Sequence, residues 1–457
     1  MQSFIRPIFL LMLIMFISAC SSDARSATTI STVTIDGVEK QVIKLAAINR
    51  HNDWLFGVIK GFNNSSETYH VEASYYMNTY VSPFAFVEMV NPGRIGEFVE
   101  AVAEAELQFN IDLANGNIPD IVLFPSQMQS NTYITKGLFT DLNEFMDNDP
   151  DFDRADYLPS LFEVFDRKGG IYEIPPMFLM YGIYAKTTDV GTDVSWTLDE
   201  FSAYIETKPD AEYILASMTK REFIIKTTQY LFVNPVAGEV KFDREEFKKI
   251  LAIAERFPIV PYDYSDERGN WEDYFWTDAR NGDPIMLPLD IYNFHMPMLW
   301  GNSFFGEEVT WKGWPSSADS GPLFSAADYF SIMKAAENLD GGWEFLKYAL
   351  NHVRVSPEMQ VQLPVNLSLL EGIKNEQVKF INNSPFYNSE HDKLKSLAGL
   401  DRLMTLFKSA NALKREEFTI NKIIDEELGI YLSGQKSADE IIDIIENRIA
   451  LYLAEQH

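Results

Sequence analysis

Apolar and polar positions near the start of the chain predict a strand pair followed by a helix and another strand. The extended stretches at 32–35 and from residue 38 flank Asp36-Gly37, a pair that accepts the positive φ angles of a tight hairpin turn. Residues 42–48 have the length and apolar character of a strand, residues 54–62 repeat apolar side chains at near-helical spacing, and residues 71–76 are again extended in pattern. This order predicts a parallel sheet.

A long amphipathic helix and a buried strand are expected next. Residues 94–114 are acidic and place apolar side chains on one face, namely Ile95, Phe98, Val99 and Val102. The run 120–124 is continuously apolar after Asp120, which is typical of a strand covered on both faces. Open α/β sheets bind ligands beyond the carboxyl ends of such strands, so Pro125, Ser126 and Gln127 are candidate ligand contacts; a solvated turn is the alternative.

The rest of the chain adds extended segments and several helices. Two extended segments are predicted over 170–186, around Pro175-Pro176. Capping boxes mark two helix starts, at Thr197 with Glu200 and at Ser437 with Glu440. Further helices are predicted over 242–255, 342–350, 420–428 and 437–453. The mixture predicts an α/β fold.

The first twenty residues have the pattern of a bacterial lipoprotein signal. Arg6 precedes ten apolar residues at 8–17, a run too short to span a bilayer comfortably but suited to the core of a signal peptide. Ser18 and Ala19 then lead to Cys20, the single cysteine of the chain. We expect removal of residues 1–19, acylation of Cys20, and a small polar tether over 20–31 that holds the protein on the outer side of the cell membrane. An ordinary secretory peptide is the alternative.

Composition and missing motifs narrow the function further. With 38 Lys and Arg against 67 Asp and Glu, the formal charge of −29 disfavours nucleic acid, whose phosphates need basic patches. The six histidines have no zinc spacing, and the sequence has neither a P-loop nor a Gly-x-Ser-x-Gly elbow. The acidic stretch 147–153 hints at a calcium loop, but Phe152 and Leu158 replace the required Gly and Glu, so a solvated loop is favoured and no metal is expected.

Several motifs occur along the chain in an order that carries a family resemblance. They are Gly116-Asn-Ile-Pro119-Asp120-Ile-Val122, Gly137-Leu-Phe-Thr-Asp141-Leu142, Gly170-Ile-Tyr172-Glu-Ile-Pro175, Gly313-Trp-Pro315, Gly341-Gly-Trp-Glu-Phe-Leu346 and Leu363-Pro364-Val365-Asn366. Behind a lipoprotein signal, this ordered set resembles the extracellular solute-binding proteins of ABC importers, in the family 1 group that includes maltose-binding-type proteins.

The resemblance implies a two-lobed α/β fold with a ligand cleft between lobes that are joined by a multi-strand hinge. It implies a first lobe of residues 32–142 and 293–336 and a second of residues 143–292 and 337–457. It also implies a monomer, without cofactor or catalysis, that captures a carbohydrate by closing over it and delivers it to an ABC permease. A lipoprotein that presents its ligand to a sensor kinase and a secreted glycoside hydrolase are the alternatives.

Candidate ligand contacts follow from the chemistry of sugars, whose C–H faces stack on aromatic rings and whose hydroxyls need polar partners. Trp271 and Trp276 lie in an aromatic cluster flanked by charge, and Tyr292, Asn293 and Trp314 are similar cases. Met177 and Phe178 follow the double proline, and Asn52 and Asp53 stand at a helix start, where free N–H groups bind anionic or hydroxylated ligands. Packing in the core is the alternative for each, and it is the favoured interpretation for Trp54.

Overall fold

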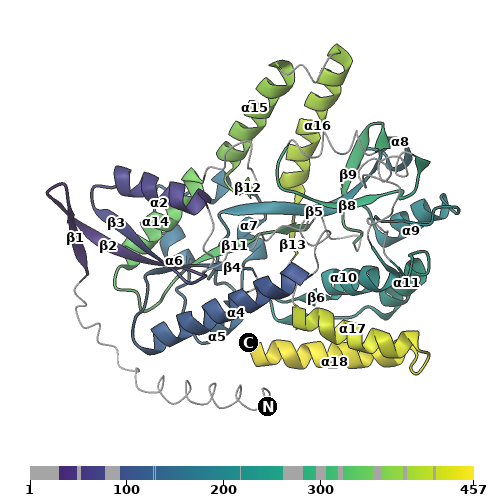
Figure 1. Cartoon of the computed structure of the whole chain (residues 1–457), viewed down its shortest axis with the longest axis horizontal. Coiled ribbons are helices and arrows are strands. Elements are labelled where there is room, and N and C mark those ends of the chain that lie inside the picture. Colours follow the sequence, from purple (N-terminus) through teal and green to yellow (C-terminus); the bar gives the residue numbers. More distant parts are fainter. Residues whose placement is uncertain are drawn as a thin grey trace.

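The computed structural model describes residues 30–48, 53–77, 93–126, 128, 130–216, 218–260, 281–294, 305–316, 323–353, 362–383, 389–414 and 418–456. Two sheets, each with its own helices, give the chain two lobes, as Figure 1 shows. Buried apolar side chains form two clusters. One lies around the first sheet and the strands next to the hinge between the lobes, and the other lies within the second lobe.

The first sheet has five strands in the described part of the chain: β1 (Thr32–Ile35), β2 (Val38–Ala47), β3 (Tyr69–Tyr75), β4 (Ile121–Pro125) and β11 (Asp328–Ile332). β2 runs parallel to β3 and β4, and β11 adds antiparallel to β4. Asp36 and Gly37 adopt φ angles of 49° and 82° in the turn between β1 and β2. The predicted hairpin and the predicted parallel sheet are therefore confirmed.

Three helices cover this sheet: α2 (Asp53–Ser65), α4 (Gly93–Ala114) and α14 (Leu339–His352). On α2, Trp54 is buried and meets Phe330 of β11 edge-to-face at 6.1 Å between ring centroids. The expectation that Trp54 belongs to the core is confirmed. Residues 121–125 of β4 are buried throughout, as their continuous apolar pattern predicted.

Asp120, just before β4, ties three distant segments of the first lobe together. Its carboxylate accepts hydrogen bonds from the backbone N–H of Lys44 in β2 at 2.8 Å and of Asn338 at 2.7 Å. Asn338 in turn caps α14, accepting from the N–H of Gly341 at 3.0 Å, and donates to the carbonyl of Val42 at 3.1 Å. The aspartate of the Pro-Asp-Ile motif thus has a structural role.

The second sheet is built around β5 (Met177–Lys186), which is paired along its whole length. Antiparallel to β5 lie β8 (Leu287–Ile291), β9 (Val309–Gly313), β10 (Leu323–Ser325) and β12 (Leu363–Pro364), and β13 (Ala412–Leu413) extends β10 in parallel. Because Gly182 lacks a Cβ, β9 can approach closely enough for the Trp311 side chain to cover β5.

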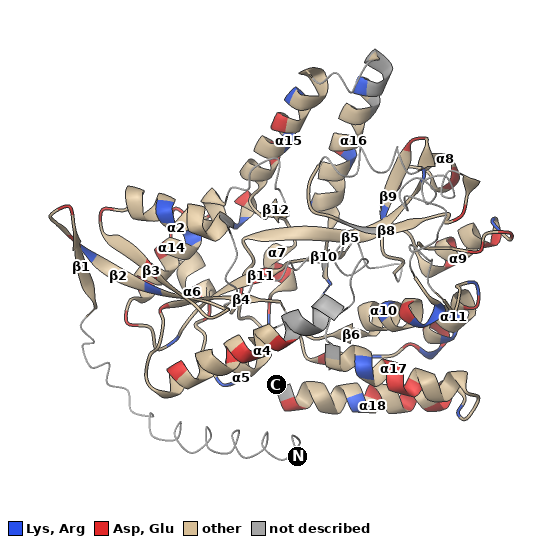
Figure 2. Cartoon of the chain, viewed as in Figure 1, with Lys and Arg blue, Asp and Glu red and all other residues tan. Residues whose placement is uncertain are grey.

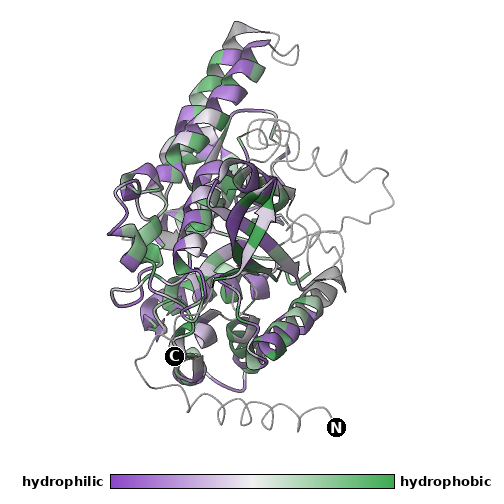
Figure 3. Cartoon of the chain, turned by 90° about the vertical axis from the view of Figure 1, so that its left-hand side faces the viewer, coloured by the Kyte–Doolittle hydropathy of each residue, from purple (hydrophilic) through white to green (hydrophobic). Residues whose placement is uncertain are grey.

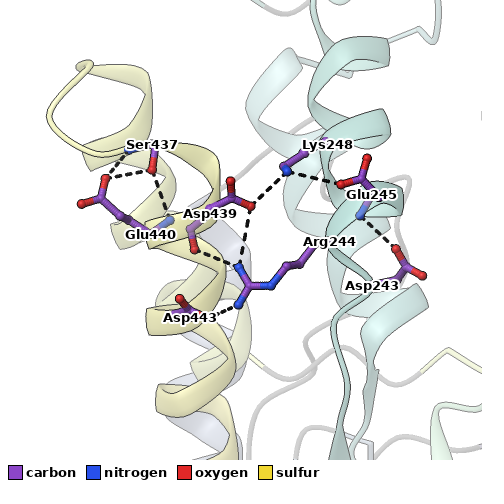
Figure 4. A network of polar contacts seen from close by, with 8 residues as sticks. All are labelled: Asp243, Arg244, Glu245, Lys248, Ser437, Asp439, Glu440 and Asp443. Atoms are coloured by element: carbon purple, nitrogen blue, oxygen red, sulfur yellow. Dashed lines mark hydrogen bonds and ion pairs between the residues drawn. The ribbon is translucent and has the colours of Figure 1, made fainter.

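Five further helices pack around the second core: α9 (Leu198–Glu206), α10 (Lys220–Phe232), α11 (Arg244–Ala254), α17 (Phe418–Leu432) and α18 (Ala438–Gln456). The capping boxes at Thr197 and Ser437 form as predicted. Figure 4 shows ion pairs joining α11 to α18, where Arg244 contacts Asp439 and Asp443, and Lys248 lies 3.0 Å from Asp439. Figure 2 shows Asp and Glu positions along α17 and α18.

Two helices that the sequence pattern did not predict project from the body of the molecule. They are α15 (Leu367–Asn383) and α16 (Glu390–Ser409), and Figures 1 and 3 show both extending upward from the second sheet. Buried apolar side chains occur along the pair, from Leu370 and Phe407 at its base to Ile381 near the far end of α15.

Strand pairing and packing place four segments differently from the predicted lobe boundaries. β9 and β10 pair with β5, so residues 309–313 and 323–325 belong to the second sheet although they were expected in the first lobe. α14 packs on α2, β2 and β11, and Ile174 pairs with Phe330 of β11, so both contact the first sheet although they were expected in the second lobe. A boundary drawn from the order of motifs does not contain these long-range pairings. In addition, none of the helices among the described residues combines the length and apolar character needed to cross a bilayer.

Candidate functional site

The carboxyl end of β4 is the place where the first lobe was expected to offer ligand contacts. The N–H of Ser126 donates to the carbonyl of Ala327 at 2.8 Å, which holds the chain beside the start of β11. α5 (Ser130–Thr135) begins a few residues later, and its Tyr133 is buried against Phe109 of α4. The end of β4 and the start of α5 therefore lie on a rigid part of the first lobe.

A polar cluster supports α5 from behind. The Tyr133 hydroxyl donates to Asn110 Oδ1 at 2.9 Å and lies 3.2 Å from Glu106 Oε1. Burial raises the pKa of Glu106, an effect that the hydrogen bond from Tyr133 partly offsets. Burial and the nearby Glu106 carboxyl also raise the pKa of Tyr133. The two contacts of the Tyr133 hydroxyl therefore fix α5 against α4.

Asn131 reaches from α5 to the second lobe. Its Nδ2 donates to the carbonyl of Pro235 at 2.9 Å, and the residue is 7% exposed. Pro235 lies in the turn between β6 (Val233–Asn234) and β7 (Glu239–Val240), which follows α10. Asn234 Oδ1 accepts from the N–H groups of Val236 and Ala237 at 3.1 and 3.0 Å, which fixes the turn.

Arg167 contacts the same turn from a second direction. Its guanidinium donates to the carbonyl of Val236 at 3.0 Å, to Asn131 Oδ1, and to Glu173 Oε1 at 2.7 Å. The Arg167 and Glu173 side chains are 7% and 0% exposed. Ile174, next to Glu173, pairs with Phe330 of β11, so this segment is attached to the first sheet.

An aromatic cluster lies on the second lobe, formed by Tyr181 of β5, Tyr230 of α10 and Trp314 after β9. Trp314 stacks on Tyr181 at 5.2 Å between centroids, and Tyr230 meets both rings edge-on at 5.7 and 5.9 Å. Lys414 Nζ lies 3.5 Å from the centre of the Tyr181 ring, and Lys226 Nζ lies 5.8 Å from it. Cation–π contacts of this kind hold an ammonium group at a fixed position.

The aromatic cluster and the contacts between the lobes share one segment of chain. Tyr230 lies in the last turn of α10, which leads directly into the turn held by Asn131 and Arg167. The region therefore places the half-buried Tyr230 ring and the Lys414 ammonium group beside the junction of the two lobes. Such groups suit recognition of a polyhydroxylated solute.

Comparison of the whole fold with solved structures identifies its type. The chain is similar to an extracellular solute-binding protein of family 1 from Alicyclobacillus acidocaldarius, with a TM-score of 0.54 at 10% identity over 91% of this chain and 98% of that one. It is also similar to the sugar-binding protein MalE from Xanthomonas citri, with a TM-score of 0.56 at 13% identity over 91% and 98% of the two chains. The chain has the fold of the extracellular solute-binding proteins.

A third solved structure with the solute-binding-protein fold is the ABC substrate-binding protein Lmo0181 from Listeria monocytogenes, in complex with cycloalternan. It matches with a TM-score of 0.52 at 14% identity, over 91% of this chain and 99% of that one. No protein-family model and no curated protein matches the sequence. The likeness is thus one of fold, carried over nearly the whole chain at low identity.

Within the solute-binding-protein fold, three predicted contact residues are packed in the core. Met177 pairs with Pro364 at the start of β5 and is 1% exposed. Phe178 is fully buried and meets Phe324 and Phe407 edge-to-face. Trp314, 2% exposed, belongs to the aromatic cluster and donates to Thr227 Oγ1 at 3.2 Å. All three have structural partners, and their contact with a ligand stays a prediction.

The other predicted contacts are placed only in part. Ser126 is half-buried at the end of β4, and Tyr292 and Asn293 are half-buried just beyond β8. Asp53 is the first residue of α2, as expected, although its side chain is not described. The remaining predictions, Cys20, Asn52, Gln127, Trp271 and Trp276, lie outside the described residues.

Asn131, Arg167, Tyr181, Tyr230 and Lys414 were not predicted from the sequence. Tyr181 lies in an apolar segment that is typical of the core, Tyr230 follows the polar run Lys226-Thr-Thr-Gln229, and Lys414 belongs to no motif. Asn131 and Arg167 are single polar residues whose partners in the turn at 235–236 are more than sixty positions away. A local signal existed only for Asn131, which closely follows the end of a buried strand.

In the acidic loop at 147–153, the carboxylates of Asp147 and Asp149 are paired with other side chains of this chain. Asp149 accepts hydrogen bonds from Trp343 Nε1 at 2.8 Å and Lys347 Nζ at 2.6 Å, while Asp147 pairs with Arg154 at 2.7 Å. Burial acts to raise the pKa of Asp149, but the bonds from Lys347 and Trp343 outweigh it and lower the pKa. Among the described residues, no group of three or more His, Cys, Asp or Glu is arranged to hold a metal ion.

Proposed function

We propose that this protein is a lipid-anchored extracellular solute-binding protein that captures a carbohydrate by closure of its two lobes and delivers it to an ABC import permease. The observation that carries the proposal is the likeness of fold over 91% of this chain to binding proteins that are themselves covered almost completely. One of these is described as sugar-binding and another as a complex with cycloalternan.

The aromatic cluster supports a carbohydrate as the solute. Micromolar affinity needs about 8 kcal/mol, which a few ring contacts and several hydrogen bonds can supply. Tyr230 and Lys414, both half-buried, are the members of this region best placed to meet a solute. We retain the sequence candidates as further contacts: Asn52, Asp53, Ser126, Gln127, Met177, Phe178, Trp271, Trp276, Tyr292, Asn293 and Trp314.

On this proposal the protein binds its solute and does not transform it. Transport requires ATP hydrolysis, and since the sequence lacks a P-loop, a partner must hydrolyse the ATP. Closure supplies the signal for delivery, because a closed shape offers the permease a different surface from an open one.

The lipid anchor is tested by Cys20→Ser, which removes the only thiol in the chain. We expect the variant to leave the membrane fraction and to appear in the medium or periplasm, because the acyl chains would have no attachment point. Cell fractionation followed by immunoblotting measures this. A variant that stays on the membrane without lipid would contradict the anchor, whereas the solute-binding fold would be unaffected.

The carbohydrate is tested by thermal unfolding of the purified protein against mono- and oligosaccharides, polyols and betaines. A solute bound only to the folded state, at a hundred times its dissociation constant, adds about 2.7 kcal/mol of stability. We therefore expect a rise of a few degrees in the melting temperature with one class of sugar.

Recovery of that sugar unchanged would support binding, and recovery of cleaved sugar would indicate a glycoside hydrolase. A shift produced only by betaines would replace the carbohydrate with a cationic solute held by aromatic rings. No shift with any compound would contradict the carbohydrate proposal.

A further inference from the structure

The two lobes are connected by a buried polar cluster, which we call the bridge: Asn131, Arg167, Glu173 and the carbonyl groups of Pro235 and Val236. Two side chains attached to the first sheet donate to two adjacent carbonyls of one turn in the second lobe, at 2.9 and 3.0 Å. α18 of the second lobe also packs against α5, so the two lobes meet on this side through more than one element.

From this geometry we infer that the bridge is a latch for lobe closure, with Asn131 and Arg167 as positioning residues that hold the lobes together without contacting the solute. This inference rests on the proposed function, because it concerns the closure by which the solute is captured. It assigns to Asn131 and Arg167 control over the balance between open and closed forms.

Each half of the latch is held in place before the lobes meet. On the first lobe, the ion pair with Glu173 orients the Arg167 guanidinium, and the planar fork of arginine leaves further N–H groups pointing at fixed angles. On the second lobe, Asn234 fixes the turn by accepting from Val236 and Ala237. Because both partners are already fixed, little conformational entropy is lost when they meet. Their hydrogen bonds therefore stabilise the closed form.

The second-lobe half of the bridge lies outside the strand pairing of the second sheet. The bridge joins the start of α5 and the segment just before β5 to a turn beyond α10, and its two carbonyls belong to a short two-stranded ribbon. A contact held there by hydrogen bonds can separate when the lobes rotate, whereas the strands paired with β5 stay joined.

The test is Asn131→Ala, which removes the bond to Pro235 and one acceptor of Arg167 but leaves the Arg167–Glu173 pair intact. Spin labels at two exposed positions, Lys136→Cys and Asp210→Cys, report the distance between the lobes in a Cys20→Ser background, which has no other cysteine. Pulsed electron resonance without any solute then gives the distribution of distances. Asn148→Ala is the matched control, because this exposed asparagine donates to the carbonyl of Glu144, four residues before it.

We expect Asn131→Ala to lower the ratio of short to long distances about fivefold, since one hydrogen bond across the lobes is lost and Arg167 loses the acceptor beside it. Arg167→Lys keeps the charge beside Glu173 but loses the fork, so it should shift the distances in the same direction. The control should match the parent protein.

Unchanged distances in Asn131→Ala and Arg167→Lys would overturn the latch and leave solute binding standing. Failure of every sugar in the thermal panel would contradict the carbohydrate proposal and leave the distances unaffected, because no solute is present when they are measured.

Discussion

Arg167→Met should lower the free energy of unfolding by about 3–5 kcal/mol, the usual cost of removing one partner from a buried ion pair. The Glu173 side chain is completely buried, so its carboxylate would lose a charged donor at 2.7 Å in a place that water does not reach. The carbonyl of Val236 and the amide of Asn131 would lose the same donor. Guanidinium-induced unfolding, followed by circular dichroism, measures the loss.

The double variant Arg167→Met with Glu173→Gln separates the charge from the packing. If an unpaired carboxylate causes the loss, the neutral amide should recover most of it, because an uncharged polar group costs far less to bury. Arg154→Met is the control, since its ion pair with Asp147 is largely exposed and should contribute less than about 1 kcal/mol. If Arg167→Met alone were as stable as Arg154→Met, a structural role for the Arg167–Glu173 pair would be contradicted.

Asp120→Ala should lower the free energy of unfolding by about 3 kcal/mol. The residue is 1% exposed, and its removal would leave the N–H groups of Lys44 and Asn338 buried without their acceptor. Each such orphaned group costs about 1–3 kcal/mol. Asp210→Ala, at an exposed position, is the control, and equal unfolding midpoints for the two variants would contradict the prediction.

Asp120→Asn should be milder than Asp120→Ala because the amide oxygen can still accept a hydrogen bond. Burial raises the pKa of Asp120, although the N–H groups of Lys44 and Asn338 act to lower it. The folded state therefore binds a proton more tightly than the unfolded chain. The stability that this residue contributes is greatest below its unfolded pKa and declines as pH rises through the folded pKa. The uncharged asparagine removes that decline. The free energies of unfolding of the parent protein and of Asp120→Asn should therefore differ more at pH 4 than at pH 7.

Local sequence signals predicted those elements whose causes are local. The Asp36-Gly37 turn formed because this pair tolerates positive φ, and α9 and α18 began at their capping boxes. α10 was missed although Thr219 and Glu222 form a third capping box, because its apolar residues do not gather on one face. Its position is set by packing against α11 and α17, which no short window of sequence contains.

The sequence alone determined the α/β class, the buried parallel strands of the first lobe, the starts of α9 and α18, and the expectation of a lipoprotein signal. These depend on periodicity, turn chemistry and capping, which act over a few residues. Only the tertiary structure decided that β9 joins the second sheet, that α14 covers the first, and that Asn131 and Arg167 meet a turn far along the chain. Such contacts depend on burial and on geometry between distant segments, and a polar residue shows its partner only once the chain has folded around it.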